Sequence, residues 1–502
     1  MQAATHAFPV GDFVSLHARG RADHPALVDA ERGRAIGYAE LDELVGRFAG
    51  WLESVHGIGV SDRVAVCGRN SLEQVMLQLA CARIGAILVP LNWRLSPAER
   101  DAILADCAPR LVVMPDGEGA GIGACVAAGT VERESSRHAP VRRPAAAARP
   151  SLMLYTSGTS GRPKGVPLSE ANLHATAVNF TILGHGTPES VFLVDTPLFH
   201  VIGMVTSIRP ALLCGGTAII SSGFDPARTF ARLADPRLRV SHYFCVPQMA
   251  ELLRTAPDFD PARLGGLTAI FTGGAPNPAS NIRAWLADGV VMADGYGMTE
   301  AGTVLGMPPS SDVIAAHAGA AGLMPPTIEH RVMRDDGSEC EAGEVGELLL
   351  RGPNLFAGYW ERADETACAF TRDGFFRTGD LVRRDRDGFF FIVGRKKEMF
   401  ISGGENVYPG EVEAVLAAHA DVTEAAVFGV PDPQWGEVGH AAVVLRAGAT
   451  ADAAAIQAHC EQGLARYKLP RSIHIITALP RTGSGKVVKT ALRELIAGGT
   501  PG

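Results

Sequence analysis

Tyr155-Thr-Ser-Gly-Thr-Ser-Gly-Arg-Pro-Lys164-Gly-Val166 is the stretch around which the rest of this chain is organised. It continues an apolar run that begins at Leu152 and predicts a buried strand. Glycines let backbone N–H groups turn towards an anion, hydroxyl side chains add donors and Lys164 adds positive charge, so the stretch suits phosphate. A Walker A loop requires Ser or Thr directly after the lysine, but Gly165 stands there. Taken alone, the stretch predicts either another kind of phosphate loop or a mobile polar surface loop.

The bulk composition is that of an ordinary globular protein with more than one domain. The chain has 502 residues, of which 47% are hydrophobic and 20% charged, and this is too long for one core. A net charge of −8 argues against a nucleic-acid partner, which needs a basic face. Nine scattered cysteines without a C-x-x-C pair predict free thiols and a cytoplasmic protein. Arg83 and Arg209 interrupt the two most apolar stretches, so we expect no transmembrane segment.

Helical and strand-like segments alternate from about residue 26, which predicts an α/β fold of layered sheets. In the first series we expect helices at 38–55 and 72–85 and strands at 63–67 and 86–90. Between 115 and 150 the alternation stops, and the Gly/Ala/Pro content predicts a weakly structured, solvent-facing connection. A second series follows, with expected strands at 190–195, 217–220, 239–245 and 267–272. Each ends in a turn or glycine-rich loop, where the ligands of open α/β sheets gather.

The last third of the chain predicts two smaller units. Short β segments with glycine turns at about 329–393 indicate a β-rich subdomain. After it, strands near 425–429 and 441–445 and a helix near 454–464 indicate a small α+β domain. We therefore expect an N-terminal domain over 1–394, which includes the β-rich subdomain, and a C-terminal domain over 395–502.

Six further stretches are as distinctive as the first, and their order along the chain is informative. They are Pro197-Leu-Phe-His200-Val-Ile-Gly203, Thr272-Gly-Gly-Ala-Pro276, Asp294-Gly-Tyr-Gly-Met-Thr-Glu300, Arg377-Thr-Gly-Asp380, Gly394-Arg395 with Ser402-Gly-Gly-Glu-Asn-Val-Tyr-Pro409, and Pro480-Arg-Thr-Gly-Ser-Gly-Lys486. In this order the seven stretches resemble the core motifs of the adenylate-forming superfamily of acyl- and aryl-CoA synthetases, peptide-synthetase adenylation domains and firefly luciferase. The resemblance extends over nearly the whole chain.

The resemblance implies a two-step reaction with ATP, Mg²⁺ and coenzyme A. A carboxylic acid and ATP give an acyl-adenylate and pyrophosphate, and a thiol then attacks the adenylate. A carboxylate is a poor electrophile, and joining it to AMP supplies a leaving group. The first step requires a site that neutralises phosphate charge and holds the acid in line with the α-phosphate.

The resemblance also assigns the ATP-binding residues. Glu300 matches the Mg²⁺ ligand and Thr299 a residue that contacts the α-phosphate, although these two residue types alone would equally suit a capped helix start. Tyr296 offers a ring to adenine, and Asp294 offers a carboxylate to its amino group. Asp380 can accept hydrogen bonds from both ribose hydroxyls, although an Asp after Thr-Gly more often marks a turn. The remaining matches are Thr156, Ser157, Gly158, Thr159, Ser160, Gly161 and Lys164 in the triphosphate loop, and Gly274, Ala275, Gly295 and Arg395 near the nucleoside.

In this family the C-terminal domain is mobile, and its rotation separates the two steps. Lys486 matches a lysine that reaches the carboxylate and the α-phosphate during adenylation, and Lys397 matches the hinge. Rotation then brings a thiol tunnel to the adenylate, and the CoA-binding matches are Ser402, Gly403, Gly404, Trp435 and Tyr467. Leu469 departs from an arginine found in some aryl-CoA ligases, and Lys468 or Arg471 could take its place.

The acid pocket is assigned by position to Phe199, His200, Gly203, Met204, Tyr243, Thr272, Gly273 and Met298, with Gly274, Ala275 and Gly295 beside it. His200 matches an aromatic gate, and we treat it as a catalytic candidate, although it could equally be a core histidine. Malonyl-CoA synthetases carry an arginine where this chain has Gly295, and Arg209 is the only other cation nearby. We therefore expect an apolar medium-chain aliphatic or aromatic monocarboxylate, because no cation is evident to pair a second carboxylate.

Three other functions remain open on the sequence. The enzyme could load an acyl group onto a carrier protein instead of CoA, it could take a malonyl-type dicarboxylate, or it could bind ATP without turnover. Its partners would be small molecules, and we expect a monomer or homodimer.

Overall fold

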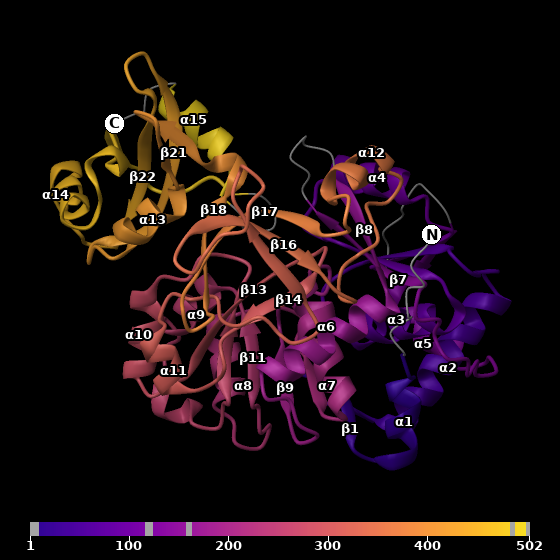
Figure 1. The fold of residues 1–502 in the computed structure, drawn as a ribbon. Helices are drawn as coiled ribbons and strands as arrows, with labels where there is room; N and C mark the ends of the chain where they lie inside the picture. The colour runs from indigo at the N-terminus through magenta and orange to yellow at the C-terminus, as the bar shows by residue number, and fades with distance from the viewer. Residues whose placement is uncertain (1–9, 116–123, 157–162, 482–486, 498–502) are drawn as a thin grey trace.

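The computed structural model describes residues 10–115, 124–156, 163–481 and 487–497. Two large sheets with their helices fill the N-terminal part, and a small antiparallel sheet lies between them and the C-terminal part, drawn orange to yellow in Figure 1. The predicted α/β fold, with a large N-terminal part and a small C-terminal one, is confirmed.

The larger sheet has eight strands in the order β14-β13-β12-β11-β9-β10-β1-β2. The six inner strands run parallel, and β14 and β2 are antiparallel edges. Its strands are β1 (Pro25–Asp29), β2 (Ala35–Gly37), β9 (Val191–Val194), β10 (Thr217–Ile220), β11 (His242–Cys245), β12 (Ala269–Thr272), β13 (Met292–Met298) and β14 (Gly302–Gly306). Because the inner strands are parallel, the segments that follow β9, β11, β12 and β13 all leave from one edge of the sheet.

The second sheet has six strands in the order β6-β5-β3-β4-β7-β8. Five run parallel, and β8 returns antiparallel to β7. Its strands are β3 (Arg63–Cys67), β4 (Ile87–Leu91), β5 (Leu111–Met114), β6 (Ala124–Ala127), β7 (Pro150–Thr156) and β8 (Lys164–Ser169). The predicted strands of both α/β series are present, although β11 and β12 are shorter than expected.

Helices cover the two sheets, and α3 (Leu72–Ile84) packs against strands of both. Ser71 caps its first turn by accepting a hydrogen bond from the Gln74 N–H, and Gly85 ends it at φ +74°. Because α3 is buried on nearly every side, it has no solvent-facing polar stripe, and its polar residues Gln74, Gln78 and Arg83 are buried too. The other helices of the N-terminal part are α1 (Phe13–Gly20), α2 (Tyr38–Ser54), α4 (Pro97–Cys107), α5 (Val131–Ser135), α6 (Glu170–Leu183), α7 (Ile208–Cys214), α8 (Pro226–Leu233), α9 (Pro247–Leu253), α10 (Ala279–Ala287), α11 (Ser311–Ala316) and α12 (Ala363–Ala369), with short 3₁₀ turns at Ala128–Thr130 and Pro261–Leu264.

The connection predicted at 115–150 is more ordered than its composition suggested. It contributes strand β6 and helix α5, and its later part lies along α2. A Cβ added at Gly46 would lie 2.8 Å from Pro140 Cβ, and one added at Gly50 would lie 2.2 Å from the Ala139 carbonyl oxygen. Two glycines on α2 therefore make room for this segment, a contact that no local pattern within 115–150 reveals.

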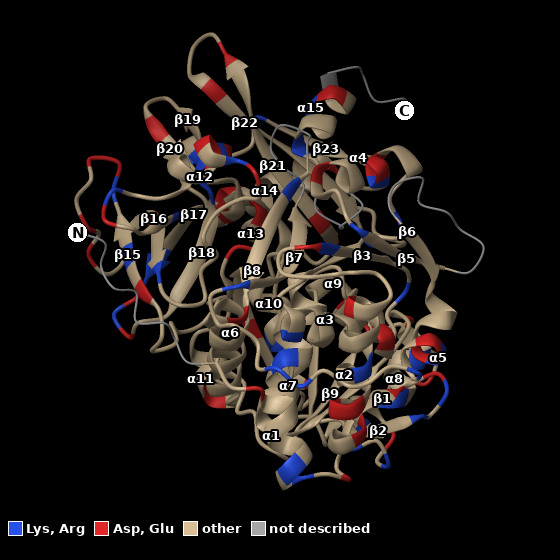
Figure 2. Cartoon of the chain, turned by 90° about the vertical axis from the view of Figure 1, so that its right-hand side faces the viewer, with Lys and Arg blue, Asp and Glu red and all other residues tan. Residues whose placement is uncertain are grey.

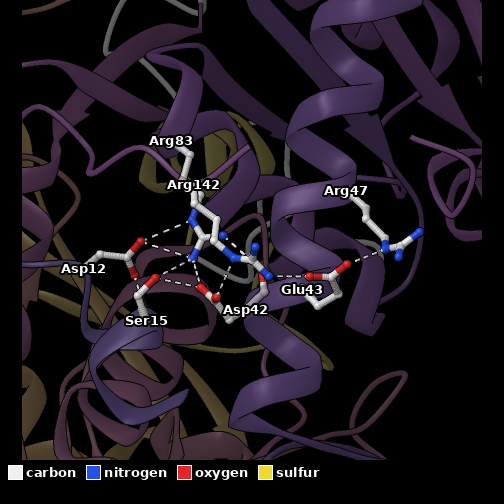
Figure 3. Close-up of polar contacts among 7 residues, drawn as sticks. All are labelled: Asp12, Ser15, Asp42, Glu43, Arg47, Arg83 and Arg142. Atoms are coloured by element: carbon white, nitrogen blue, oxygen red, sulfur yellow. Dashed lines mark hydrogen bonds and ion pairs between the residues drawn. The ribbon is translucent and has the colours of Figure 1, made fainter. Parts of the chain in front are cut away.

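A buried ion network fastens the same segment to the first helices (Figure 3). Arg83 of α3 binds Asp12, 3.1 Å away, and Asp42 of α2, and Arg142 binds the other oxygen of Asp42 at 3.2 Å. Burial opposes the charge on Asp42, but hydrogen bonds from Ser15 and Arg83 outweigh it and lower the pKa of the carboxyl. The charged pairs thus hold α1, α2, α3 and residues 139–143 together.

The predicted β-rich stretch forms a four-stranded antiparallel sheet in the order β15-β16-β17-β18. Its strands are β15 (Glu329–Met333), β16 (Val345–Arg351), β17 (Phe376–Arg384) and β18 (Phe390–Arg395). The next strand after β18 belongs to a different sheet. A domain boundary at 394/395 fits this change of sheet and stays a prediction.

The C-terminal part is a five-stranded sheet flanked by helices, and the two strands and the helix predicted there are among its elements. The strands are β19 (Phe400–Ser402), β20 (Glu405–Val407), β21 (Val422–Asp432), β22 (Gly436–Leu445) and β23 (Ser472–Ile475), and the helices are α13 (Pro409–Ala417), α14 (Ala453–Gly463) and α15 (Lys489–Ala497), with a 3₁₀ turn at Arg466–Lys468. Its apolar cores contain only residues from Phe400 onwards.

The surface carries charges of both signs. In the view of Figure 2 the basic and acidic residues are intermixed rather than gathered on a basic face. Within the described residues, no helix combines the length and the apolar character that crossing a bilayer requires.

Candidate active site

The loop that opened the sequence joins two antiparallel strands. Thr156 ends β7 and Lys164 begins β8, and the two residues pair directly across the ladder. Ser157, Gly158, Thr159, Ser160 and Gly161 lie outside the described residues, so their contact with phosphate stays a prediction. Lys164 is thus the first residue of the second strand in this pair of antiparallel strands, next to the loop that joins them.

Thr299 and Glu300 lie in a tight turn between β13 and β14, not at the start of a helix. Met298 pairs with Gly302 across this hairpin. Gly302 has φ +61°, and a Cβ there would lie 2.2 Å from Thr176 Oγ1, so this turn requires glycine. The turn buries Glu300 to 8% exposure and places it at the edge of the sheet where the parallel strands end.

Glu300 and Lys164 both contact Tyr359, a residue that no sequence motif singled out. The Tyr359 hydroxyl donates to Glu300 Oε1 at 2.9 Å, and Lys164 Nζ lies 5.3 Å from the centre of the Tyr359 ring. Glu365 of α12 pairs with the Lys164 ammonium. Tyr359 belongs to Gly358-Tyr-Trp360, which is not one of the seven distinctive stretches, so no motif gave a reason to place it in the site.

The donor set at Glu300 fits Mg²⁺. Among the described residues, Glu300 Oε2 has no hydrogen-bond partner, whereas Oε1 is taken by Tyr359. Mg²⁺ prefers hard oxygen ligands and is commonly held by one or two carboxylates together with substrate phosphates. Glu300 could supply the protein ligand, while Lys164 lies close enough to share the phosphate charge.

Asp380 and Arg395 face each other across β17 and β18, and Tyr296 reaches them from the hairpin. Arg395 Nε lies 2.7 Å from Asp380 Oδ1, and the Tyr296 hydroxyl donates to Asp380 Oδ2. Asp380 is 3% exposed and lies within a strand, so its interpretation as a turn residue is wrong. The structure thus brings three predicted nucleoside residues together, from three strands.

Asp294 is buried at the end of the parallel strands. Its Oδ1 accepts a hydrogen bond from Thr272 Oγ1 at 2.7 Å, and Thr272 Oγ1 also accepts from Asn277 Nδ2. Burial is the main cause that raises the pKa of Asp294, to about 7. The Thr272 hydroxyl is therefore a hydrogen-bond donor to Asp294. The place of Thr272 in the acid pocket stays a prediction.

The glycine-rich segment after β12 packs against side chains that the sequence analysis did not name. A Cβ at Gly273 would lie 3.4 Å from Phe244 Cζ, and one at Gly274 would lie 3.3 Å from Ile202 Cδ1. Ile202 begins a π-helix (Ile202–Ser207) that also contains Gly203 and Met204. Phe199 and His200 precede it, with ring centres 4.6 Å apart. Met298 is the last residue of β13, Gly295 lies within the same strand, and Ala275 lies in the segment that follows β12.

The Tyr243 side chain points away from the glycine-rich segment after β12. Its hydroxyl donates to Asp195, which also accepts from Thr229 of α8. Phe244, the next residue along β11, has its ring 5.8 Å from that of Phe180 in α6. Because successive side chains of a strand point to opposite faces, Tyr243 faces α8, and Phe244 occupies the side where Gly273 lies.

Arg209 is not available to pair a second carboxylate of an acid. It is 2% exposed and binds both oxygens of Glu170, at 2.7 and 2.9 Å, and Gln78 Oε1 at 2.8 Å. A buried guanidinium with this set of partners is a structural ion pair.

The predicted CoA-binding residues lie in the C-terminal part: one ends β19, three lie in turns between strands, and Tyr467 lies in the 3₁₀ turn. Gly403 N–H donates to the Trp435 carbonyl oxygen at 2.9 Å, and Ser402 ends β19 beside them. Gly403 and Gly404 both have positive φ, +60° and +88°. The Trp435 side chain is 44% exposed and Tyr467 is 39% exposed. Lys468, a candidate replacement for the absent arginine, lies 5.6 Å from the Tyr467 ring centre and pairs with Glu411.

The predicted hinge residue Lys397 lies in a short 3₁₀ turn (Lys396–Glu398), and the residues on both sides of it form ion pairs. Before it, Lys396 binds Glu347 of β16 at 3.1 Å and Asp335 at 2.8 Å. After it, Glu398 binds Lys489 of α15 at 2.9 Å. Lys486, the predicted adenylation lysine, lies outside the described residues.

Comparison with known proteins accounts for this arrangement. The family model described as AMP-binding enzyme matches residues 14–360, and the AMP-binding enzyme C-terminal domain matches residues 411–486. A feruloyl-CoA synthase from Amycolatopsis sp is 38% identical over 482 residues, covering 95% of this chain and 97% of the relative.

Solved structures agree with the sequence relatives. ATP-bound MatB from Rhodopseudomonas palustris matches with a TM-score of 0.87 at 32% identity, over 96% of this chain and 98% of that one. The O-succinylbenzoate coenzyme A synthetase MenE from Bacillus subtilis, in complex with ATP and a magnesium ion, matches with a TM-score of 0.85 at 28% identity, over 96% and 99%. The chain belongs to the AMP-binding enzyme family, the adenylate-forming superfamily that its motifs resemble.

Proposed function

We propose that this chain is an ATP- and Mg²⁺-dependent acid–CoA ligase that forms an acyl-adenylate and then an acyl-CoA. The observation that carries the proposal is that three charged features from three different sheets are joined through Tyr359 and Tyr296. They are the Glu300 carboxylate, the Lys164 ammonium and the Asp380–Arg395 pair. The feruloyl-CoA synthase and the coenzyme A synthetase MenE, which cover nearly the same length, support the same activity, and the ATP-bound MatB supports ATP as a substrate.

In the first step, the site must hold ATP while the acid attacks the α-phosphate. Asp380 accepts hydrogen bonds from the ribose, Tyr296 lies against adenine, and Lys164 and residues 156–161 hold the β- and γ-phosphates. Thr299 contacts the α-phosphate, and Lys486 joins the acid carboxylate to it. Mg²⁺, held by Glu300, neutralises phosphate charge so that the acid anion can approach.

In the second step, after pyrophosphate has left, the thiol of CoA attacks the acyl-adenylate. The bond between the acyl carbon and the AMP oxygen breaks, the thiolate sulfur bonds to the acyl carbon, and AMP leaves. Ser402, Gly403 and Gly404 line the approach of the thiol, with Trp435 and Tyr467 beside the rest of CoA. Rotation of the C-terminal domain about Lys397 moves Lys486 away from the adenylate and brings this surface towards it.

The acid is an apolar monocarboxylate, aromatic or medium-chain aliphatic. Phe244, Ile202, Met204 and Met298 are apolar side chains at the predicted pocket, and Phe199 and His200 lie at its mouth. Arg209 is held by Glu170, so a dicarboxylate would place a second charge among apolar groups without a partner. The aromatic substrate in the name of the feruloyl-CoA synthase relative favours an aromatic acid.

An acid-dependent pyrophosphate-release screen tests this function. Substituted benzoates and cinnamates should be compared with straight-chain acids of graded length and with malonate, each with ATP, Mg²⁺ and CoA. We expect release with an apolar monocarboxylate and none with malonate. A malonate-specific enzyme, or transfer to a phosphopantetheinylated carrier protein in preference to CoA, would contradict the proposal. We propose a cytoplasmic enzyme, because its nine cysteines are free thiols, and we propose a monomer or homodimer.

A further inference from the structure

Tyr359 contacts both of the opposite charges at the proposed adenylation site. Its hydroxyl donates to Glu300 Oε1 at 2.9 Å, and its ring lies beneath the Lys164 ammonium, with Nζ 5.3 Å from the ring centre. An ammonium over an aromatic face is attracted by the negative face of the ring. One side chain therefore contacts both Lys164 and Glu300.

The segment around Tyr359 is fastened to the same two elements by its backbone. The Phe356 N–H donates to the Glu300 carbonyl oxygen at 2.9 Å, and the Trp360 N–H donates to the Gly165 carbonyl oxygen at 2.9 Å. The Tyr359 N–H donates to Thr366 Oγ1 at 3.0 Å. The segment thus bridges the hairpin that carries Glu300 and the strand that begins at Lys164.

The residue before Tyr359 must be a glycine for this bridge to form. Gly358 has φ +152°, and a Cβ there would lie 2.4 Å from Thr366 Cγ2. Phe356 packs edge-on against the Tyr359 ring, with the centres 4.8 Å apart. The ring orientation is therefore set by packing before any ligand binds.

We propose that Tyr359 is a positioning residue of the adenylation site, whose hydroxyl orients Glu300 towards the metal and whose ring keeps Lys164 apart from that carboxylate. This inference rests on the proposed function. By taking Oε1, the hydroxyl leaves Oε2 as the one oxygen of Glu300 directed to Mg²⁺. By holding the ammonium over its face, the ring keeps Lys164 from neutralising Glu300 before ATP binds.

The chemistry of the phenol suits this role. The phenol O–H is a hydrogen-bond donor, and it is directed at the Glu300 carboxylate. A hydrogen bond to a carboxylate is stronger than a neutral one, and partners that orient a metal ligand commonly change metal affinity when removed. Glu365, which pairs with Lys164, holds the ammonium until phosphate oxygens compete for it.

The test separates metal binding from nucleotide binding. The protein's affinity for α,β-methylene-ATP is measured with and without Mg²⁺. The ratio of the affinity with Mg²⁺ to the affinity without it measures how much the metal contributes to nucleotide binding. Tyr359→Phe should lower this ratio about tenfold and leave the metal-free affinity unchanged. It should also raise the Mg²⁺ concentration needed for half-maximal activity, with kcat restored at high Mg²⁺. Tyr38→Phe is the matched control, because it removes a buried hydroxyl that donates to the Gly216 carbonyl oxygen, in a part of the fold outside the site.

A second pair of variants tests the spacing by the ring. Tyr359→Leu should lower the ratio further than Tyr359→Phe, because Lys164 can then move onto Glu300. Adding Lys164→Met to Tyr359→Leu should recover part of the ratio. If the double variant recovers nothing, the spacing role is wrong.

Three results distinguish this inference from the proposed function. A wild-type ratio of one, with no Mg²⁺ effect on nucleotide binding, would count against the function itself. A normal wild-type ratio that is unchanged in Tyr359→Phe would overturn only the role of Tyr359. Equal losses of affinity with and without Mg²⁺, beyond those of Tyr38→Phe, would show a general structural role and also overturn the proposal.

Discussion

Replacing Asp380 by asparagine should weaken ATP binding without slowing the chemical step. Asp380 is 3% exposed, and its oxygens already accept from Arg395 and Tyr296, so the ribose must use its remaining lone pairs. Asparagine keeps one acceptor oxygen and loses the charge. The variant therefore loses about one charge-assisted hydrogen bond, worth roughly 1.5–3 kcal/mol, which corresponds to roughly a 10- to 150-fold weaker Kd for ATP.

Titration calorimetry with ATP and with 2′-deoxy- and 3′-deoxy-ATP would measure this effect. In the wild type, removal of either hydroxyl should weaken binding, whereas in Asp380→Asn the same removal should cost less, because the two changes delete one interaction. Asp373→Asn is the control, since Asp373 is an exposed acid of the same region that pairs with Arg331. A folded Asp380→Asn protein with wild-type affinity for all three nucleotides would refute the assignment of Asp380 to the ribose.

Three further predictions concern the other parts of the site. Lys486→Ala should suppress adenylate formation far more than CoA attack on a supplied acyl-adenylate, and equal losses in rapid-quench assays of the two steps would contradict the rotation account. Gly403→Ala should raise the KM for CoA and leave CoA-independent pyrophosphate exchange unchanged, because φ is +60° and the new Cβ would lie 2.9 Å from Trp435 Cε3; loss of exchange alone would argue against a thiol-side role. The pKa of Asp294 is about 7 in the folded protein, above the ordinary 3.8, so the folded protein binds this proton more tightly than the unfolded chain does. The protonated Asp294 therefore stabilises the fold below pH about 4, and this stabilisation is lost as the pH rises to about 7. In urea unfolding, wild-type stability relative to Asp294→Asn should therefore fall by up to about 1.4 kcal/mol per pH unit in this window, and a constant difference would refute the raised pKa.

Strong local patterns predicted most of the fold. The parallel strands β9 to β12 appeared as short apolar runs, and α3 appeared as an apolar helix, because both are buried on all sides and tolerate few polar residues. Residues 124–135 were missed, since a strand at a sheet edge and a one-turn helix are stabilised by neighbours far along the chain. Gly46 and Gly50, which receive that segment, lie on a helix predicted for other reasons.

The candidate site was predictable where a motif carries its chemistry and not where contact depends on packing. Asp380, Arg395 and Tyr296 meet as the motifs implied, although they come from different strands. The sequence could not show that Tyr243 and Phe244 face opposite sides of the sheet, or that Arg209 is already paired. Tyr359 was missed because its role depends on a bridge between Glu300 and Lys164 that only the folded chain forms.

The central claim is that the acid is activated by forming a bond to the α-phosphate of ATP. The most direct measurement uses an accepted acid whose carboxylate is labelled with ¹⁸O, followed by mass spectrometry of the AMP produced with CoA present. The account predicts that AMP carries one labelled oxygen for each acyl-CoA formed, because the oxygen that attacks phosphorus leaves with AMP. Unlabelled AMP, or ADP and phosphate in place of AMP and pyrophosphate, would contradict it.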